Sequence, residues 1–267
     1  MNENTNTPSS GTTDNGVPYL VIPGSPDRVV AIWHLLDPPR TEVAMASALP
    51  LTGFDATKVY LGLPMSGSRT PNGGPEAIFE LLARDAPALV HGPIFEQAVA
   101  EFPAAFSQLL EQFHVSADAA IGLVGGSMGS AIAAGVLADG MTGVRAAVLV
   151  SPMMQLRTMI DEVAPMFGGY AWSPAGQVAA ERMDFVARAA QVVAGRTALR
   201  VILGLDDADG MTGPARAFAT ATGADVHELP GVGHALADEP GIAPAPQTQG
   251  ARMVDALAAA WLQENLD

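Results

Sequence analysis

The sequence predicts an α/β fold in which a mostly parallel central sheet is covered by helices on both faces. Short, β-rich apolar runs alternate with longer Ala-rich helical segments from residue 17 almost to the C-terminus, which is typical of parallel strands joined by crossover helices. The strand runs are mostly apolar rather than alternating, as expected for strands buried on both faces. We therefore expect a single domain over residues 17–267, preceded by a disordered tail over residues 1–16, which are mostly Asn, Thr, Ser, Gly and Asp.

The individual elements follow from these apolar and Ala-rich runs, taken in chain order. We expect strands at residues 17–22, 29–33, 58–63, 119–124, 146–150, 200–203 and 225–228. Between them we expect helices at residues 41–49, 94–113, 128–138, 213–222 and 251–265.

One interval, residues 153–196, departs from this alternation. It contains two helical patterns with no strand between them, separated by Gly168, Gly169 and Pro174. An excursion of this length between two strands is long for a simple crossover, so we expect a small helical cap over the strand ends. Its methionines suit an adaptable apolar pocket, and we expect three of them to bind substrate, namely Met153, Met154 and Met159.

Composition excludes several classes of function. The chain of 267 residues has 13 Lys and Arg against 28 Asp and Glu and no Cys. The acidic excess argues against nucleic acid as a partner, because phosphate binding depends on clustered Lys and Arg. Without Cys there is no thiolate nucleophile and no Cys-based metal site. The first residues do not form a signal peptide, and the uncharged run at residues 119–138 is interrupted by glycines, so we expect a cytoplasmic protein with no membrane span.

The most informative motif is the pentapeptide Gly125-Gly-Ser-Met-Gly129, a G-x-S-x-G sequence between an apolar strand and a helix. A serine on such a sharp turn has a strained backbone, and glycines two positions to either side avoid collisions there. The helix that follows places N–H groups next to the serine, where an oxyanion would form. A phosphate-binding loop is the competing interpretation, but the glycine spacing does not give G-x-G-x-x-G and no Lys occupies the P-loop position.

A serine hydroxyl becomes a nucleophile only when an imidazole takes its proton and a carboxylate holds that imidazole. The chain offers both downstream of Ser127. A predicted strand ends in a loop with three carboxylates, Asp206, Asp207 and Asp209, and a later turn contains His234. The order serine, acid, histidine is the one that the G-x-S-x-G motif requires.

At these places the chain resembles the α/β-hydrolase family. The matching segments are residues 125–129, Gly204-Leu-Asp-Asp207, Gly231-Val-Gly-His234 and the loop at residues 61–68. The resemblance implies an α/β-hydrolase fold with Ser127 as the nucleophile, His234 as the general base and Asp207 as the acid, with Asp206 as the alternative acid.

The resemblance also implies an oxyanion hole made by two N–H groups. Met128 would supply the first and the loop after the third strand the second, where we favour Leu36 over Leu35. Leu35 stands where many family members have glycine, and we expect it to contact substrate. Pro38 and Pro39 have no N–H to donate. His34 is as consistent with loop packing as with a functional role.

We therefore predict a serine hydrolase that cleaves a small-molecule carboxylic ester with an apolar acyl group through an acyl-enzyme intermediate. Thioester cleavage, amide cleavage and acyl transfer use the same groups, and a binding protein that keeps the fold without turnover is a further alternative. We expect structural roles for the remaining histidines, His91, His114 and His227. No pair of histidines has the spacing of a zinc site, so we expect no metal and no cofactor.

Overall fold

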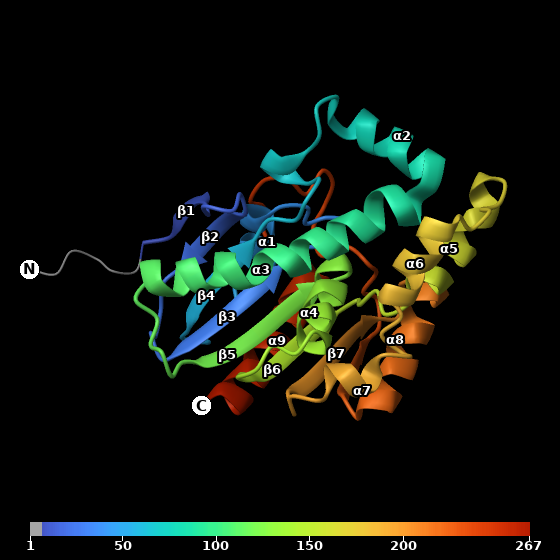
Figure 1. Cartoon of the computed structure of the whole chain (residues 1–267). Helices are drawn as coiled ribbons and strands as arrows, with labels where there is room; N and C mark the ends of the chain where they lie inside the picture. The colour runs from blue at the N-terminus through green and yellow to red at the C-terminus, as the bar shows by residue number, and fades with distance from the viewer. Residues whose placement is uncertain (1–6) are drawn as a thin grey trace, which may run out of the picture.

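The computed structural model describes residues 7–267, and within them the chain forms one sheet of eight strands (Figure 1). The strand order is β1-β2-β4-β3-β5-β6-β7-β8. The pairs from β4–β3 to β7–β8 are parallel, whereas β1–β2 and β2–β4 are antiparallel. The strands are β1 Ser9–Thr12, β2 Pro18–Ile22, β3 Arg28–Trp33, β4 Thr57–Leu61, β5 Ala120–Gly126, β6 Val144–Val150, β7 Ala198–Gly204 and β8 Asp225–Leu229. The predicted fold class and all seven predicted strands are therefore confirmed.

Helices cover both faces of the sheet, so that each face has its own apolar core (Figure 1). Helices α3 (Gly92–Gln112), α4 (Met128–Ala138) and α8 (Asp209–Thr222) pack on one face. On the other face lie α1 (Glu42–Ala48) and α9 (Gln249–Leu266). Burial on both sides explains why the central strands are almost wholly apolar.

The beginning of the chain differs from the predicted tail. Residues 1–6 of that prediction lie outside the described residues, but Ser9–Thr12 forms β1, which pairs antiparallel with β2. The turn after β1 is also anchored, because the Asn15 side chain donates to the backbone carbonyl of Glu101 at 2.8 Å. The tail prediction was wrong here because a short polar edge strand has no apolar alternation to reveal it.

The expected cap interval contains α5 (Leu156–Val163), the 3₁₀ helix η3 (Ala164–Phe167), α6 (Pro174–Arg182) and α7 (Ala189–Val192). A second excursion, between β4 and β5, was not predicted as helical before residue 94. It contains the 3₁₀ helix η1 (Gly67–Arg69), helix α2 (Gly74–Ala86) and the π-helical turn η2 (Pro87–His91). The two excursions meet, since the Tyr170 hydroxyl donates to Asp85 at 2.5 Å. In Figure 1, α2, α5 and α6 stand together at one end of the molecule.

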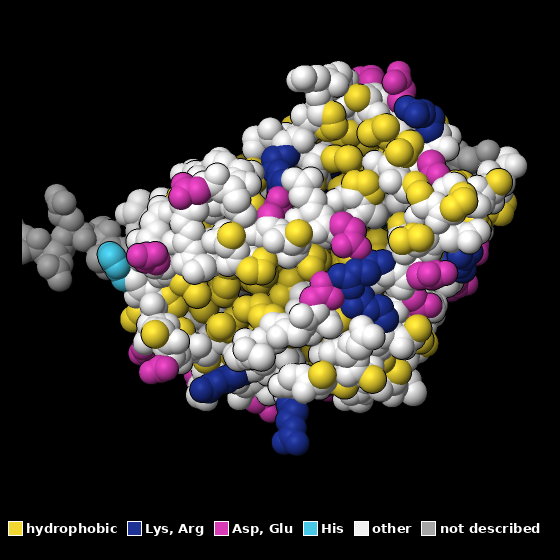
Figure 2. Space-filling model, in the orientation of Figure 1, with side chains coloured by type: hydrophobic (Ala, Val, Ile, Leu, Met, Phe, Trp, Pro, Cys, Tyr) yellow, Lys and Arg dark blue, Asp and Glu magenta, His cyan; other side chains and the backbone are white. Residues whose placement is uncertain are grey.

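The surface drawn in Figure 2 has hydrophobic side chains gathered in a hollow near its centre. This hollow is a groove of about 620 Å³ between α3 and the connection from α4 to β6. It lies on the α3 side of the sheet and includes none of the predicted site residues. No helix among residues 7–267 is long and apolar enough to cross a membrane.

Candidate active site

Ser127 lies on a sharp turn between the last residue of β5 and the first residue of α4. Its backbone has φ 49° and ψ −112°, a left-handed conformation that costs a non-glycine residue energy and is typical of functional sites. The turn is held in place because the Ser127 N–H donates to the carbonyl of Val150 on β6 at 2.9 Å. Ser127 is only 6% exposed.

Two glycines make this turn possible. A Cβ atom at Gly125 would lie 2.2 Å from the backbone oxygen of Gly129, on the first turn of α4. A Cβ atom at Gly129 would lie 2.6 Å from the backbone oxygen of Trp33 and 2.7 Å from that of His34. The first and last glycines of the motif therefore allow β5, α4 and the end of β3 to approach closely, as the motif predicts.

His234 reaches the serine from the loop after β8. The backbone of this loop packs against the end of β7, where a Cβ atom at Gly204 would lie 2.2 Å from the Val232 oxygen. The Asp206 N–H donates to the same Val232 oxygen at 3.0 Å. The loop that carries the carboxylates and the loop that carries His234 are thereby fixed relative to each other.

The side chains of Ser127, His234 and Asp207 form a continuous series of hydrogen bonds. His234 Nε2 lies 2.9 Å from Ser127 Oγ, and His234 Nδ1 lies 2.8 Å from Asp207 Oδ2. Asp207 Oδ1 accepts the N–H of Ala208 at 2.7 Å, and its side chain is 4% exposed. Asp206 and Asp209 are exposed, so Asp207 is the carboxylate that the structure places against the imidazole.

The surroundings of His234 make its imidazole more basic. Burial lowers the pKa of His234, but the hydrogen bond and charge of Asp207, together with the charge of Asp37, outweigh it and raise the pKa above its usual value. Asp37 Oδ2 lies 3.6 Å from Nε2, on the serine side of the ring. An imidazole held in this way is oriented to accept the hydroxyl proton of Ser127.

Leu36 and Met128, two residues of the cavity that contains Ser127, have unpaired backbone N–H groups within the described part of the chain. Met128 is the first residue of α4, so its N–H lies outside the helical hydrogen-bond ladder, and Leu36 lies in the loop after β3. Within residues 7–267, neither N–H has a hydrogen-bond partner, whereas the N–H of Leu35 donates to Pro39 at 3.2 Å. Both Leu36 and Met128 line the cavity that contains Ser127. Unpaired N–H groups at such a turn are the kind of donor that an oxyanion site needs.

The buried ring of His34 anchors the loop after β3. Its Nδ1 donates to the Leu35 carbonyl at 2.6 Å, and its Nε2 accepts the N–H of Leu63 at 3.1 Å. Burial lowers the pKa of His34 to about 4, so the ring is neutral, as these two bonds require. His34 does not line the cavity, and its contacts are those of a loop-packing residue.

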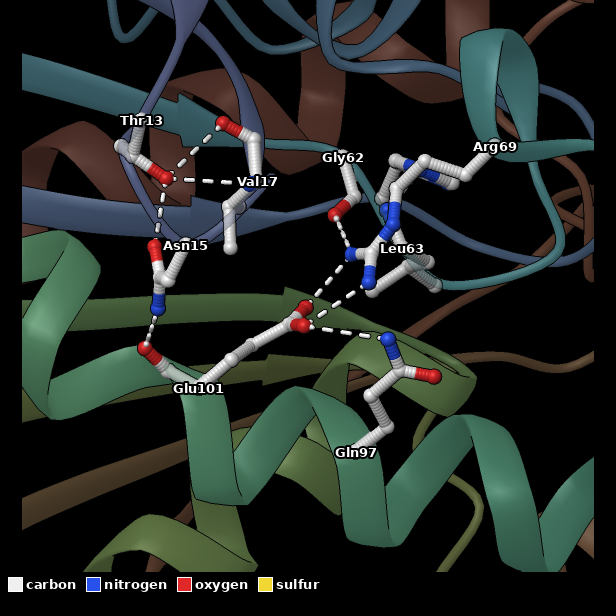
Figure 3. A network of polar contacts seen from close by, with 9 residues as sticks. Thr13, Asn15, Val17, Gly62, Leu63, Arg69, Gln97 and Glu101 are labelled. Carbon is white, nitrogen blue, oxygen red and sulfur yellow. Dashed lines mark hydrogen bonds and ion pairs between the residues drawn. The ribbon is translucent and has the colours of Figure 1, made fainter.

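A polar network supports the Gly62–Leu63 backbone from the opposite side (Figure 3). Arg69 Nη1 donates to the Gly62 carbonyl at 3.4 Å. The same guanidinium forms a bidentate salt bridge with Glu101 of α3, with Nη1–Oε1 at 2.5 Å and Nη2–Oε2 at 2.8 Å. Gln97, one turn earlier on α3, donates to Glu101 Oε2 at 3.3 Å. Helix α3 is thus connected through Arg69 to the backbone that holds His34.

A cavity of about 360 Å³ opens beside Ser127. Met153 and Met159, two of the residues expected to bind substrate, line it together with Leu36 and Met128. Leu35 and Met154 were also expected there, but the structure places both elsewhere. Both side chains are fully buried, and Leu35 packs beneath the turn, where it would lie 2.3 Å from a Cβ atom at Gly126.

The cavity also contains residues that the sequence did not single out as functional. Asp37 lies in the loop after β3, Glu162 and Val163 come from α5, and Met211 comes from α8. His91, expected to be structural, borders the cavity from the second excursion. No local motif marks these positions, because they are brought together only by the packing of α5 and η2 near the ends of the strands. Within the described part of the chain, no cluster of three or more His, Cys, Asp or Glu side chains has a metal-binding arrangement.

Comparison with known proteins finds similarity in structure but not in sequence. No family model matches the chain, and no curated protein matches it in sequence. A cold-adapted esterase from an Arctic intertidal metagenomic library is similar over 97% of this chain and 93% of its own, with a TM-score of 0.61 and 19% identity. Dienelactone hydrolase from Anabaena variabilis is similar over 97% and 99%, with a TM-score of 0.60 and 13% identity.

A third similar structure is a peptidase. The acylaminoacyl peptidase of Pyrococcus horikoshii is similar over 97% of this chain and 42% of its own length, with a TM-score of 0.63 and 14% identity. At these identities the similarity establishes the fold alone. The parallel sheet, the serine turn after β5 and these neighbours together show that the chain has the α/β-hydrolase fold.

Proposed function

We propose that the chain is a serine hydrolase that cleaves carboxylic esters through an acyl-enzyme intermediate. The hydrogen-bonded series from Ser127 through His234 to Asp207 carries this proposal, because it is the arrangement that converts a hydroxyl into a nucleophile. The fold similarity to an esterase and to a dienelactone hydrolase supports it. These residues and roles are the ones that the sequence predicts.

In the first half of the proposed reaction, Ser127 Oγ attacks the ester carbonyl carbon while His234 Nε2 accepts the hydroxyl proton. Asp207 stabilises the imidazolium that forms. The carbonyl oxygen becomes an oxyanion, and the N–H groups of Leu36 and Met128 donate to it. The tetrahedral intermediate then collapses, the bond to the alcohol oxygen breaks, and His234 gives its proton to the departing alcohol.

In the second half, water attacks the acyl-enzyme and His234 Nε2 accepts its proton. The second tetrahedral intermediate expels Ser127 Oγ, which recovers its proton from the imidazolium, and the carboxylic acid leaves. The acyl group lies against the apolar wall of the cavity, formed by Met153, Met159, Val163 and Met211. Methionine side chains adapt to ligands of different shape, which favours acceptance of several acyl lengths.

A panel of p-nitrophenyl esters of increasing acyl length tests this proposal, using the wild type and Ser127→Ala. We expect turnover of short and medium acyl chains by the wild type and a loss of about 10⁶-fold in kcat for the alanine variant. Ser107→Ala, at an exposed position on α3, is the matched control and should retain full turnover. Full turnover by Ser127→Ala would contradict the assignment of the nucleophile.

The thioester and amide alternatives are tested by the same enzyme preparations. A butyryl thioester and butyryl p-nitroanilide are compared with p-nitrophenyl butyrate by kcat/KM, and added alcohols test acyl transfer. We expect the ester to be cleaved fastest and water to be the main acceptor. A chain that folds and binds these esters without turning any of them over would instead be a binding protein.

A further inference from the structure

The cavity beside Ser127 contains a histidine that the proposed reaction does not use. His91 ends the π-helical turn η2, immediately before α3, and borders the cavity opened by Ser127, His234 and α5. His91 is only 9% exposed. A π-helical turn is uncommon and occurs frequently at functional sites.

One nitrogen of this ring is engaged and the other is not. His91 Nδ1 lies 3.0 Å from the carbonyl oxygen of Ala86, and because a carbonyl only accepts, Nδ1 donates. Among residues 7–267, His91 Nε2 has no hydrogen-bond partner, yet the atom is accessible to solvent. His91 lines the cavity and its Nδ1 is engaged, so Nε2 is the ring nitrogen available to a ligand there.

The chemistry of the free nitrogen follows from this tautomer. Burial lowers the pKa of His91, so the ring is neutral near pH 7. A neutral imidazole whose Nδ1 carries the proton has a lone pair at Nε2, which is a hydrogen-bond acceptor. A ligand that enters the cavity and displaces solvent from this acceptor must donate a hydrogen bond in return, because otherwise the acceptor is left unpaired at a cost in free energy.

The remaining polar side chains of the cavity have the same preference. Asp37, which is 56% exposed, and Glu162 of α5 both line the cavity, and both are acceptors when ionised. No Lys or Arg lines it within the described ranges. Arg40, on the same loop as Asp37, is paired with Glu239 at 2.5 Å and 2.9 Å. Away from the N–H groups of Leu36 and Met128, the cavity therefore favours ligands that donate hydrogen bonds and disfavours anions.

We propose that the ester substrate carries a hydroxyl or amino group that donates a hydrogen bond to His91 Nε2, and that esters with a free carboxylate are rejected. This inference rests on the proposed ester hydrolysis and specifies its substrate class. His91 acts on substrate choice, because it binds a group remote from the reacting carbonyl and takes no proton in the reaction.

Matched ester pairs test this inference on the wild type. In the acyl pair, p-nitrophenyl 3-hydroxybutyrate is compared with the isosteric 3-methylbutyrate. In the alcohol pair, 2-hydroxyethyl butyrate is compared with propyl butyrate. We expect the hydroxyl ester to have the higher kcat/KM in one pair, by about 3- to 10-fold, which is the range of one net hydrogen bond. The p-nitrophenyl monoester of succinic acid should be cleaved at least about 10-fold more slowly than the butyrate ester, because of like-charge repulsion.

A variant identifies the residue responsible. His91→Phe keeps an aromatic ring and removes the Nε2 acceptor. The ratio of kcat/KM within the preferred pair should therefore fall to about 1, even if both kcat/KM values change. His227→Phe, on β8 outside the cavity, is the matched control and should leave the ratio unchanged. Thermal unfolding confirms that both variants are folded.

The outcomes separate this inference from the proposed function. If the wild type hydrolyses the esters but prefers the hydroxyl member of neither pair, the inference is overturned and ester hydrolysis stands. A hydroxyl preference that survives in His91→Phe also overturns it. A 3-aminobutyrate ester, added as a further arm, distinguishes the two donors: preference for the amine without preference for the hydroxyl would point to Asp37 and Glu162 rather than to His91. Absence of any ester turnover would overturn the proposed function itself.

Discussion

A methyl group at position 129 would test how the turn after β5 supports the loop after β3, which carries Leu36. Gly129 lies on the first turn of α4, directly against the backbone that leads from β3 into Leu36. A Cβ atom there would lie 2.6 Å from the Trp33 oxygen and 2.7 Å from the His34 oxygen, whereas ordinary contact begins near 3.4 Å. Both obstacles are backbone atoms, so no side-chain rotation relieves the clash.

The size of the effect follows from this geometry. The end of β3 must move away from α4 by about 0.8 Å to reach ordinary contact. The two N–H groups that we propose as oxyanion donors lie on opposite sides of that boundary, because Met128 begins α4 and Leu36 lies in the loop after β3. A displacement approaching 1 Å costs about 10²-fold in rate, or about 2.7 kcal/mol of transition-state stabilisation. We expect kcat/KM of Gly129→Ala to fall by about this factor, and overpacking to lower the free energy of unfolding by about 1–3 kcal/mol.

The assay is hydrolysis of p-nitrophenyl butyrate, with the free energy of unfolding measured separately in urea. Gly195→Ala is the matched control, because Gly195 is an exposed turn position where the nearest atoms to an added Cβ lie at 3.8 Å, an ordinary contact. It should keep full activity and change the free energy of unfolding by less than about 1 kcal/mol. If folded Gly129→Ala retained kcat/KM within about threefold of the wild type, the proposed dependence of activity on the close approach between α4 and the loop after β3 would be refuted.

Three further predictions concern the imidazole and the network behind it. Asp207→Asn should lower kcat by about 10⁴-fold, because the carboxylate no longer holds the tautomer or stabilises the imidazolium. In the wild type, kcat/KM should fall as the pH drops through the pKa of His234, with a midpoint above 6.5, since only the neutral ring accepts a proton; in Asp207→Asn the midpoint should move to lower pH. Arg69→Ala should lower the free energy of unfolding in urea by about 1.5–3 kcal/mol, because Glu101 loses a charged partner where both side chains are under 15% exposed. Arg216 pairs with Glu228, and both of these side chains are more than 40% exposed. This pair should contribute less, so that Arg216→Ala lowers the free energy of unfolding by under about 1 kcal/mol.

Each of these predictions has a contradicting result. An Asp207→Asn variant with wild-type kcat would show that the carboxylate does not orient the ring. A pH profile that is flat from 5 to 8 would show that the imidazole does not limit the reaction. Equal losses of stability in the two arginine variants would show that burial of the Arg69 pair adds nothing.

The strands and the sheet-covering helices were predictable because burial imposes a pattern on them. Helix α4 occupies the predicted residues 128–138, since a glycine turn precedes it and every position but its last is buried. Strand β5 ends two residues after its predicted end, β6 begins two residues before its predicted start, and β7 begins two residues earlier and ends one residue later than predicted. Helix α2 was not predicted: it has no buried residue, and it follows a segment rich in Pro and Gly.

The residues of the candidate site likewise include some that the sequence predicts and some that it does not. Ser127, His234 and Asp207 were identified because the serine turn, the strand end and the glycine turn each leave a local signal in the sequence. The cavity wall was only partly predictable. The methionine-rich interval indicated Met153 and Met159, which line the cavity, but also Met154, which does not. His91 and Glu162 reach the cavity from two separate excursions, and this depends on how α2, α5 and α6 pack together.

Covalent labelling with a fluorophosphonate, followed by peptide mass spectrometry, tests the nucleophilic serine most directly. The reagent reacts with a serine only when its hydroxyl is activated and an oxyanion site receives the phosphoryl oxygen. We expect a single adduct on Ser127 of the folded wild type, no adduct on Ser127→Ala, and a rate lowered by several orders of magnitude in His234→Ala. Folded wild-type protein that stays unlabelled, or that is labelled at another serine, would contradict the account.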